Sequence, residues 1–381
     1  MLKKKKILFY IDTLAQGGLD KVVTEILNNL NFDKYEVTLI RRFPGGYYTN
    51  FLDSHIITKS NMPFKEESSE IYNHLVRVLC DKIPRKILYK LFIRGKYDVE
   101  VACDDAIAAR VIGGSTNKKS LKILWEHMDA MVNVSSATDY SEKKAKWFFD
   151  PFNKIIGVSN YCAKRFVQKY GFNQKVSYIY NPVDVENIKK RSNDFVPTEL
   201  KKEIFNIVML GALVEPKGYL RIINVAKKIK KAGYGFQIFI IGEGNMREEI
   251  EEKIEKCGLK NEIVLLGFKE NPYPYIKLCD LFVCGSYHES YCLAVAESMV
   301  LNKAILSTKC AGPIELLDNG KYGKIVENTE DAIFDGIINM IKYPEERKEY
   351  EKLLNDMNEI FSVDESVKKW EKIFDGENKR G

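Results

Sequence analysis

Residues 205–232 read FNIVMLGALVEPKGYLRIINVAKKIKKA, and this stretch decides the fold class. It holds a short apolar run at Ile207–Leu210, a loop with two glycines, and then an amphipathic pattern at Leu220–Ala232. Short apolar runs that alternate with amphipathic helices are typical of α/β proteins with parallel sheets. The stretch therefore predicts one buried strand, a loop at the carboxyl end of that strand, and one covering helix.

The same alternation continues on both sides of this unit. Further amphipathic patterns occupy Leu19–Leu30, Tyr161–Tyr170, Met246–Cys257 and Asp364–Phe374. Further apolar runs, each a candidate strand, occupy Ile7–Ile11, Val37–Ile40, Val99–Cys103, Leu121–Trp125, Ile155–Val158, Gln237–Ile241, Ile263–Leu266, Leu281–Cys284 and Ala304–Ser307. We therefore expect an α/β fold built from doubly wound parallel sheets.

The length of the chain and one break in the pattern predict two domains. At 381 residues the chain is too long for one ordinary hydrophobic core. The alternation stops near Asn181, and a polar stretch, 183–202, precedes the next strand. We predict Rossmann-like domains at 1–183 and 184–362, with a terminal helix in 363–381 that returns to the first domain. Ligands of such folds bind at the carboxyl ends of the strands, in the cleft that two domains leave between them.

Charge is divided unevenly along the chain. The net charge is +6; residues 1–185 hold 29 Lys and Arg against 20 Asp and Glu, and residues 186–381 hold 30 against 33. The basic first half indicates an anionic partner, and nucleic acid, an anionic membrane surface or an anionic acceptor all fit the charge alone. No recognised nucleic-acid-binding motif accompanies it, so we expect no nucleic-acid partner.

Composition excludes several other classes of protein. No apolar run approaches the roughly 18 residues that a membrane-spanning helix needs. The basic N-terminus leads into an apolar run that is too short for a signal peptide. The eight cysteines form no C-x-x-C, and with four histidines there is no zinc-binding spacing. We expect a cytoplasmic protein that holds no metal, with its cysteines as small core residues.

Three groups of residues can carry chemistry, and each has a purely structural alternative. Gly17 and Gly18 follow the first strand, where glycines allow close approach of a ligand or form a tight turn. Lys217 follows a strand, where it binds phosphate or is simply solvated. Glu289 and Glu297 lie eight apart around a helix start, where they accept sugar hydroxyls or serve as a cap and a solvated side chain. No G-x-G-x-x-G fingerprint occurs, which disfavours a dehydrogenase.

Taken in order, these pieces resemble the retaining nucleotide-sugar glycosyltransferases of family four, which have the GT-B fold. The resemblance rests on seven short motifs in the same order along most of the chain. They are G-G-L-D-K-V-V (17–23), V-S-N-Y (158–161), N-P-V-D (181–184), G-A-L-V-E-P-K-G (211–218), I-G-E-G (241–244), L-L-G-F (265–268) and E-x7-E (289–297). The implied fold is two Rossmann-like domains that face a central cleft.

The resemblance implies a role for each matching position. His127 would lie beside the donor sugar, Lys217 would hold the diphosphate and Glu289 would bind sugar hydroxyls, and these three form the implied catalytic set. Glu297 would bind the ribose. The alternative for His127 is a partly buried structural histidine. The implied donor-binding set is Gly17, Gly18, Gly211, Lys217, Gly242, Gly267, Glu289, Ser290, Tyr291, Cys292, Leu293 and Glu297.

Three positions depart from the family pattern. Ala212 stands where the family usually has Arg, so one cation on the diphosphate is missing. Ser290 and Cys292 stand in the usual glycine-rich run after the first glutamate, which puts additional side chains next to the donor sugar. These departures leave the identity of the donor sugar and the strength of the activity open.

The resemblance implies transfer of a sugar from a UDP-linked donor, with retention of configuration, to a glycan or lipid-linked acceptor in cell-surface polysaccharide or glycoconjugate biosynthesis. A helix N-terminus and Lys217 can stabilise the departing diphosphate, and no D-x-D motif occurs, so we expect no cofactor and no metal. The alternatives are a non-catalytic sugar-nucleotide-binding partner of an active glycosyltransferase and a basic nucleic-acid-binding protein.

One basic segment suggests a contact with the membrane. Lys82–Lys96 carries cations that alternate with apolar side chains at helical spacing. Such a helix can lie in an anionic membrane surface at the inner face of the cell membrane, or it can pack on its own sheet. The cations are Lys82, Arg85, Lys86, Lys90, Arg94 and Lys96.

Overall fold

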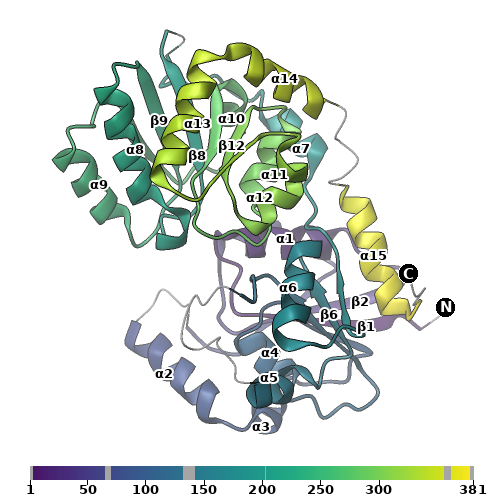
Figure 1. Cartoon of the computed structure of the whole chain (residues 1–381). Coiled ribbons are helices and arrows are strands. Elements are labelled where there is room, and N and C mark those ends of the chain that lie inside the picture. The colour runs from purple at the N-terminus through teal and green to yellow at the C-terminus, as the bar shows by residue number, and fades with distance from the viewer. Residues whose placement is uncertain (1–2, 65–69, 132–141, 202, 356–361, 378–381) are drawn as a thin grey trace. The chain divides into compact units, whose positions relative to one another are not determined.

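The computed structural model describes residues 3–64, 70–131, 142–201, 203–355 and 362–377. The chain divides into two compact units (Figure 1). The N-terminal unit comprises Met1–Pro182 together with Val363–Gly381, and the C-terminal unit comprises Val183–Ser362. Each unit contains one parallel sheet.

The N-terminal unit has a seven-stranded parallel sheet in the order β3-β2-β1-β4-β5-β6-β7. The two central strands of this sheet are buried, β1 from Ile7 to Ile11 and β4 throughout, because their side chains are mostly apolar. The strands are β1 Lys5–Ile11, β2 Tyr35–Arg41, β3 Ile57–Ser60, β4 Val99–Ala102, β5 Leu121–Glu126, β6 Lys154–Gly157 and β7 Val176–Tyr178. The helices are α1 Gly18–Asn28, the 3-10 helix Tyr47–Phe51, α2 Glu70–Lys82, α3 Arg85–Phe92, α4 Ile107–Ile112, α5 Glu142–Phe149 and α6 Asn160–Tyr170.

The C-terminal unit has a six-stranded parallel sheet in the order β10-β9-β8-β11-β12-β13. The strands are β8 Phe205–Leu210, β9 Phe236–Ile241, β10 Ile263–Gly267, β11 Leu281–Cys284, β12 Ile305–Thr308 and β13 Lys324–Val326. The helices are α7 Val185–Arg191, α8 Tyr219–Lys231, α9 Arg247–Lys256, α10 Tyr273–Leu278, α11 Leu293–Val300, α12 Ala311–Leu316, α13 Glu330–Lys342 and α14 Pro344–Leu354, with 3-10 turns at Glu215–Lys217 and Asp318–Gly320. Helix α8 contacts both α9 and α13 on one side of the sheet, and α7, α10, α11 and α12 form the group on the other side (Figure 1).

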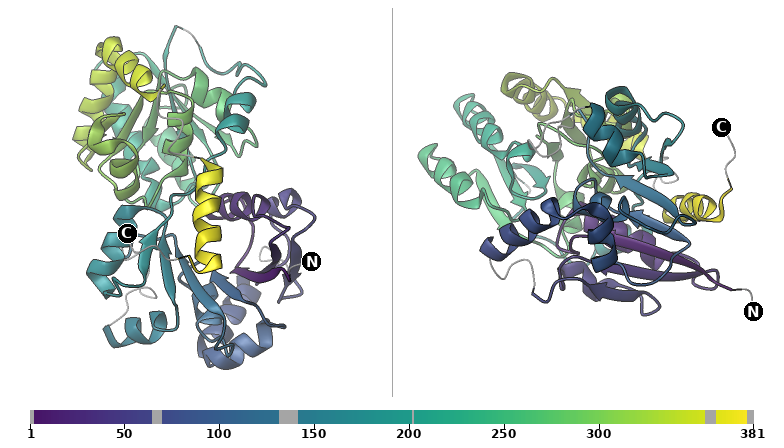
Figure 2. Two further views of the ribbon diagram at one scale, coloured as in Figure 1. Left: turned by 90° about the vertical axis from the view of Figure 1, so that its right-hand side faces the viewer. Right: turned by 90° about the horizontal axis from the view of Figure 1, so that it is seen from below.

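The last helix, α15 (Val363–Asp375), belongs to the N-terminal unit although it follows the C-terminal unit in the sequence. Figure 2 shows it in yellow against the N-terminal strands. The Trp370 ring packs 4.7 Å from the Trp125 ring, and the Phe374 ring lies edge-on to Phe9. These buried aromatic side chains hold the helix in place because they remove a large apolar area from water.

Strand order places the ligand site of each unit. In the C-terminal unit the order reverses between β8 and β11, because the chain runs outward from β8 through β9 and β10 and then returns to the other side of β8. Ligands of doubly wound sheets bind outside the carboxyl ends of the strands at this switch point. The corresponding point in the N-terminal unit lies between β1 and β4.

The ten apolar runs identified in the sequence all form strands, and the expectation of two parallel α/β domains is confirmed. The expectation of a helix through Lys82–Lys96 is wrong in part. Helix α2 ends at Lys82, and a separate helix, α3, extends only from Arg85 to Phe92. Pro84 causes the break, since the residue before a proline is disfavoured in helical conformation and proline has no N–H to donate.

Candidate functional site

Two loops meet at the switch point of the C-terminal unit. The first loop, 211–218, follows β8, and the second loop, 285–292, follows β11. The Tyr287 N–H donates to the carbonyl of Pro216 at 2.7 Å, which joins the two loops. Gly218 at the end of the first loop has φ +70°, and a Cβ there would lie 2.3 Å from the carbonyl oxygen of Gly285. Glycine is therefore required for the two loops to approach so closely.

The buried side chain of Arg221, on α8, donates hydrogen bonds to backbone carbonyls of the second loop. Its Nε donates to the carbonyl of Gly285 at 2.8 Å, and its Nη2 donates to the carbonyl of Ser286 at 2.6 Å. The guanidinium also lies 3.9 Å from the centre of the Tyr287 ring. Because these interactions occupy Arg221, it positions the second loop and does not supply the cation that Ala212 lacks.

An ion pair joins the two loops at their centre. The Lys217 Nζ lies 2.6 Å from the Glu289 Oε1, and the Ser286 hydroxyl donates to the same oxygen at 2.7 Å. The Lys217 side chain is 28% exposed and the Glu289 side chain 8%. Burial acts to lower the pKa of the Lys217 ammonium, but the carboxylate of Glu289 outweighs it and the net effect raises that pKa well above its usual range. Lys217 is therefore charged at neutral pH.

The ion pair lies at one side of a narrow pocket, in which Lys217 is the one cationic side chain among the lining residues that the structure describes. The wall is otherwise largely apolar and comes from the ends of β8 and β11 and from the start of α11. The lining residues are Met209, Leu210, Lys217, Tyr219, Phe282, Val283, Cys284, Gly285, Ser286, Glu289, Cys292 and Ala294. A pocket with one ammonium and one carboxylate on apolar walls suits a ligand that carries both an anionic and a hydroxyl-bearing part.

Helix α11 starts at the edge of this pocket. Cys292 has φ +71° and ends the loop in a left-handed turn, so that the first amides of Leu293–Val300 begin next to Glu289. Glu297 is buried in the second turn, Tyr291 is buried, and Ser290 and Leu293 are half-buried. Residues 289–297 thus lie in one loop and in the first two turns of α11, and their donor-binding roles stay predictions.

One of the predicted donor-binding glycines, Gly242, has a structural reason that needs no ligand. A Cβ at Gly242 would lie 2.0 Å from the carbonyl oxygen of Gly211, so the loops after β8 and β9 meet only because Gly242 has no side chain. The N–H of Gly242 donates to the carbonyl of Gly267 at 2.9 Å, which extends this contact to β10. Donor binding by Gly211, Gly242 and Gly267 stays a prediction.

The predicted residues of the N-terminal unit lie at the carboxyl ends of its strands, Gly17 and Gly18 after β1 and His127 after β5. Gly17 caps α1, and its N–H donates to the Asp20 carboxylate at 3.0 Å. A carboxylate thus already lies at the amino end of α1, where an anionic ligand would otherwise bind. His127 follows β5; its Nε2 is buried and makes no hydrogen bond to any of the described residues. Burial lowers the pKa of His127 to about 3, so the imidazole is neutral at physiological pH.

Sequence reasoning missed a group of carboxyls beside His127. Asp104 and Asp105 follow β4, and Glu126 ends β5. Burial, with the neighbouring Asp105, raises the pKa of Asp104 to about 6, and burial also raises the pKa of Asp105 and of Glu126. The available signal was a pair of aspartates directly after a predicted strand, at the edge where ligands bind.

The raised pKa of Asp104 predicts a pH-dependent gain of stability in Asp104→Asn. The folded pKa of about 6 exceeds the ordinary 3.8, so ionisation destabilises the folded state as the pH rises from about 4 to about 6. The substituted amide keeps an oxygen for the N–H groups of Ala106 and Ala108 but cannot ionise. We expect chemical denaturation at pH 7 to show that the free energy of unfolding rises by about 1–2 kcal/mol. A fully buried group would give more, because one pKa unit corresponds to about 1.36 kcal/mol and solvent screens a partly exposed group. The gain in the free energy of unfolding should vanish at pH 3. The control Asp33→Asn, at an exposed position, should show no gain at either pH. An equal gain for Asp104→Asn at both pH values would refute this explanation.

The C-terminal unit resembles a known protein family, and the whole chain resembles known proteins. Residues 189–353 match the model of the family described as glycosyl transferases group 1. The chain is 26% identical over 363 residues to the Campylobacter jejuni N-acetylgalactosamine-N,N'-diacetylbacillosaminyl-diphospho-undecaprenol 4-alpha-N-acetylgalactosaminyltransferase, covering 91% of this chain and 93% of that protein. It is 23% identical to the Staphylococcus aureus poly(ribitol-phosphate) alpha-N-acetylglucosaminyltransferase, over 74% of this chain and 56% of that protein.

Solved structures share the fold at lower identity. Anabaena HepE in complex with UDP and glucose superposes with a TM-score of 0.75 at 17% identity, covering 98% of this chain and all of that one. Sucrose-phosphate synthase from Thermosynechococcus elongatus gives a TM-score of 0.77 at 12% identity, covering 98% of this chain and 99% of that one. The likeness extends over both units of the chain.

Proposed function

Because the chain belongs to the glycosyl transferases group 1 and has the GT-B fold, we propose that its switch-point pocket binds a UDP-linked sugar and passes that sugar on with retention of configuration. The observation that carries the proposal is the Lys217–Glu289 pair at the start of α11. It puts a cation, a carboxylate and helix N–H groups within one pocket, where ligands of this fold bind.

The chemistry follows from the charge on each group. Lys217 and the amides at the start of α11 stabilise the negative charge that grows on the diphosphate as the bond from sugar C1 to phosphate oxygen breaks. The acceptor oxygen forms a bond to C1 on the same face, and its proton passes to the departing phosphate oxygen. Glu289 accepts hydrogen bonds from sugar hydroxyls and so fixes the orientation of C1. Glu297, buried in the second turn of α11, binds the ribose.

His127 acts in this proposal as a neutral hydrogen-bonding group. With a pKa of about 3, the ring carries no charge that it can lose or gain near pH 7. Its buried Nε2 has no partner among the described residues, and a hydroxyl of the donor sugar is a suitable one. The carboxyls of Asp104 and Glu126 lie at the carboxyl ends of β4 and β5 in the same sheet as His127, and this proposal gives them no role in the transfer.

The acceptor is a glycan or a lipid-linked glycan of a cell-surface polysaccharide. The support is that two relatives are named for such acceptors, an undecaprenol-linked sugar in Campylobacter jejuni and poly(ribitol phosphate) in Staphylococcus aureus. No helix in the described ranges is long and apolar enough to cross a membrane. A lipid-linked acceptor is held in a bilayer, so the protein has to approach the bilayer surface to reach it.

Helix α3 offers such a surface. Ile87 and Leu91, one turn apart, are 52% and 58% exposed, and exposed Lys86 and Lys90 stand next to them. Arg85 contributes less, because its guanidinium stacks on the Trp147 ring at 4.2 Å. We propose that this face of α3 lies in an anionic membrane surface, with apolar side chains inserted and lysines beside the headgroups.

Liposome flotation tests the membrane contact. The double variant Ile87→Ser/Leu91→Ser should float with anionic vesicles much less than the parent, since about 1–3 kcal/mol of apolar insertion is lost per side chain. Flotation with neutral vesicles should recover little of the parent or of the variant, because neutral vesicles carry no anionic headgroups to attract the lysines. Equal recovery of parent and variant with anionic vesicles would reject α3 as the contact.

The proposed function is tested by a panel of nucleotide sugars. Stabilisation against heat identifies the donor because bound ligand favours the folded state, and release of nucleoside diphosphate measures turnover. Turnover should persist in excess EDTA, since Lys217 and helix amides hold the diphosphate in place of a metal. Activity that EDTA abolishes and Mn²⁺ restores would contradict the metal-independent mechanism, and an inverted product anomer in NMR spectra would contradict retention.

A further inference from the structure

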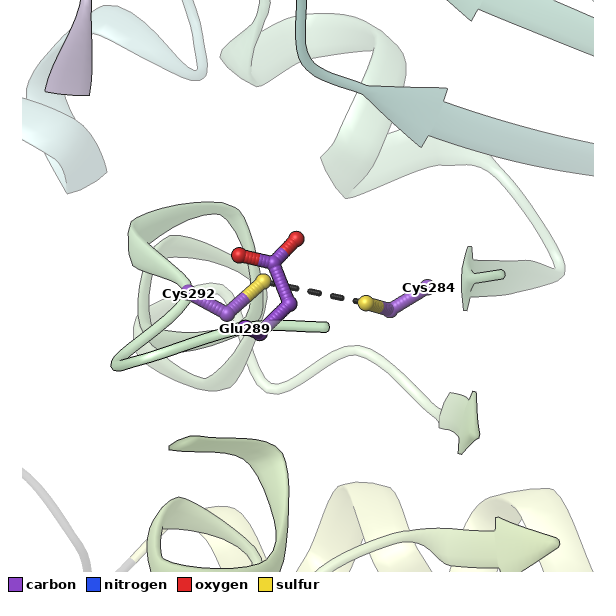
Figure 3. Close-up of side chains that lie close together, drawn as sticks. All are labelled: Cys284, Glu289 and Cys292. Carbon is purple, nitrogen blue, oxygen red and sulfur yellow. Dashed lines mark hydrogen bonds between the residues drawn. The ribbon is translucent and has the colours of Figure 1, made fainter. Parts of the chain in front are cut away.

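The pocket brings two thiols and one carboxylate together (Figure 3). Cys284 ends β11, Cys292 precedes α11, and Glu289 lies in the loop between them. The two Sγ atoms are 3.8 Å apart, and both lie within 4.8 Å of a carboxylate oxygen of Glu289. In the part of the chain that the structure describes, these three side chains form a group of possible metal ligands. Spacing alone gives no hint of this group, because C-x7-C is not a metal-binding signature.

The distance between the thiols suits a tetrahedral metal ion. Two thiolates that each lie about 2.3 Å from a tetrahedral Zn²⁺ are roughly 3.8 Å from each other. The Cys284 and Cys292 sulfurs already have this separation. A disulfide needs a sulfur–sulfur distance of about 2.05 Å, so the two sulfurs would have to approach by roughly another 1.7 Å. The geometry therefore favours an ion over a disulfide.

The third ligand and the charge balance also fit a divalent ion. Lys217 and Ser286 both bind the Oε1 of Glu289, so the second oxygen of the carboxylate can serve a metal without loss of either contact. Two thiolates and one carboxylate carry three negative charges, and a divalent ion together with the Lys217 ammonium carries three positive ones. Neutrality matters here because Cys284 and the Glu289 side chain are 6% and 8% exposed, and unbalanced charge is costly in a buried site.

We propose that Cys284, Cys292 and Glu289 form a binding site for a thiophilic divalent cation such as Zn²⁺, and that the bound ion inhibits sugar transfer. Water takes the fourth position, on the side of the pocket. The inhibition rests on the proposed function, because the ion occupies the carboxylate that is to bind the donor sugar. Binding of the ion itself does not depend on that function.

Binding is tested with Co²⁺ on the full chain, freed of metal and kept reduced by a phosphine. Thiolate ligation gives an absorption band in the near ultraviolet, and Zn²⁺ should displace Co²⁺ and remove the band. Cys284→Ala and Cys292→Gly should each lose the band, and Glu289→Gln should bind more weakly. Glycine suits the left-handed turn at Cys292, so that variant should fold even if Cys284→Ala does not. Cys257→Ala removes a thiol outside the group and should bind like the parent.

Absence of the thiolate band in the parent, or its persistence in a folded Cys292→Gly, overturns the site. Turnover is then measured with and without Zn²⁺ in the same reducing buffer. We expect the parent to lose turnover in proportion to site occupancy and EDTA to restore it, while Cys292→Gly keeps its own rate with Zn²⁺ present. Undiminished turnover with the band present overturns the inhibition and leaves the site standing. Failure of every nucleotide sugar to be turned over refutes the proposed function and leaves the Co²⁺ result unaffected.

Discussion

Lys217→Ala should lower turnover roughly a hundredfold to a thousandfold, the usual loss when one positioned electrostatic group is removed from a transition state. The structure gives the reason for so large an effect. Lys217 is the one cation among the described pocket-lining residues, Ala212 supplies no second charge, and Arg221 is held beneath the loop by backbone carbonyls. Steady-state release of nucleoside diphosphate measures the loss, with exposed Lys227→Ala as the matched control.

Loss of stability must be separated from loss of catalysis in this variant. Removal of Lys217 leaves the Glu289 carboxylate, 8% exposed, without its counter-charge, and an unpaired buried charge destabilises a fold. The double variant Lys217→Ala/Glu289→Gln removes both charges and should recover most of the free energy of unfolding. Its turnover should remain as low as that of Lys217→Ala. A double variant that regains both stability and turnover would show that Lys217 acts only on folding.

Glu289→Gln should lower turnover about a hundredfold while affinity for UDP stays near that of the parent. The carboxylate is proposed to accept hydrogen bonds from sugar hydroxyls, and charged hydrogen bonds contribute about 1.5–3 kcal/mol each. UDP lacks the sugar, so its affinity should not fall; the loss appears in the rate with UDP-sugar. Calorimetric titration with UDP and a rate measurement give the two quantities.

Exposed Glu248→Gln, on the first turn of α9, serves as the control for this change and should behave like the parent in both assays. A fall in UDP affinity that equals the fall in rate would place Glu289 on the nucleotide instead of the sugar. An unchanged rate in a folded Glu289→Gln would remove Glu289 from the site altogether.

The strands that sequence predicts and those that it misses differ in burial. Nine of the ten predicted strands are apolar runs that are largely buried within their sheets; the tenth, β10, is an apolar run at a sheet edge in which only Ile263 is buried. The missed strands, β3, β7 and β13, are three or four residues long and at least partly exposed. Each lies at one end of its sheet, so only one neighbouring strand covers it. Edge strands of this kind carry no apolar run for a sequence pattern to detect.

Sequence motifs single out the pocket residues, but they do not predict the contacts between those residues. Lys217 and Glu289 are each recognisable from a short motif, yet they stand 72 positions apart in the sequence and nothing local indicates a 2.6 Å ion pair. In the sequence, Arg221 looks like an ordinary helical cation. Its hydrogen bond to the carbonyl of Gly285 depends on the close approach of two loops, which no local pattern predicts. The Cys284–Cys292 contact depends on the left-handed backbone conformation of Cys292. Cysteine seldom adopts this conformation, and no local sequence pattern predicts it here.

Hydrogen–deuterium exchange with and without UDP tests most directly whether the donor binds at the switch point of the C-terminal unit. Binding there must order the loops after β8 and β11 and cover the first amides of α11, because the diphosphate is proposed to rest on them. We predict slower exchange on addition of UDP at 211–218 and 285–297, with no change on the exposed face of α9. Protection confined to other segments, with 211–218 and 285–297 unaffected at saturating UDP, would contradict the assignment of the pocket.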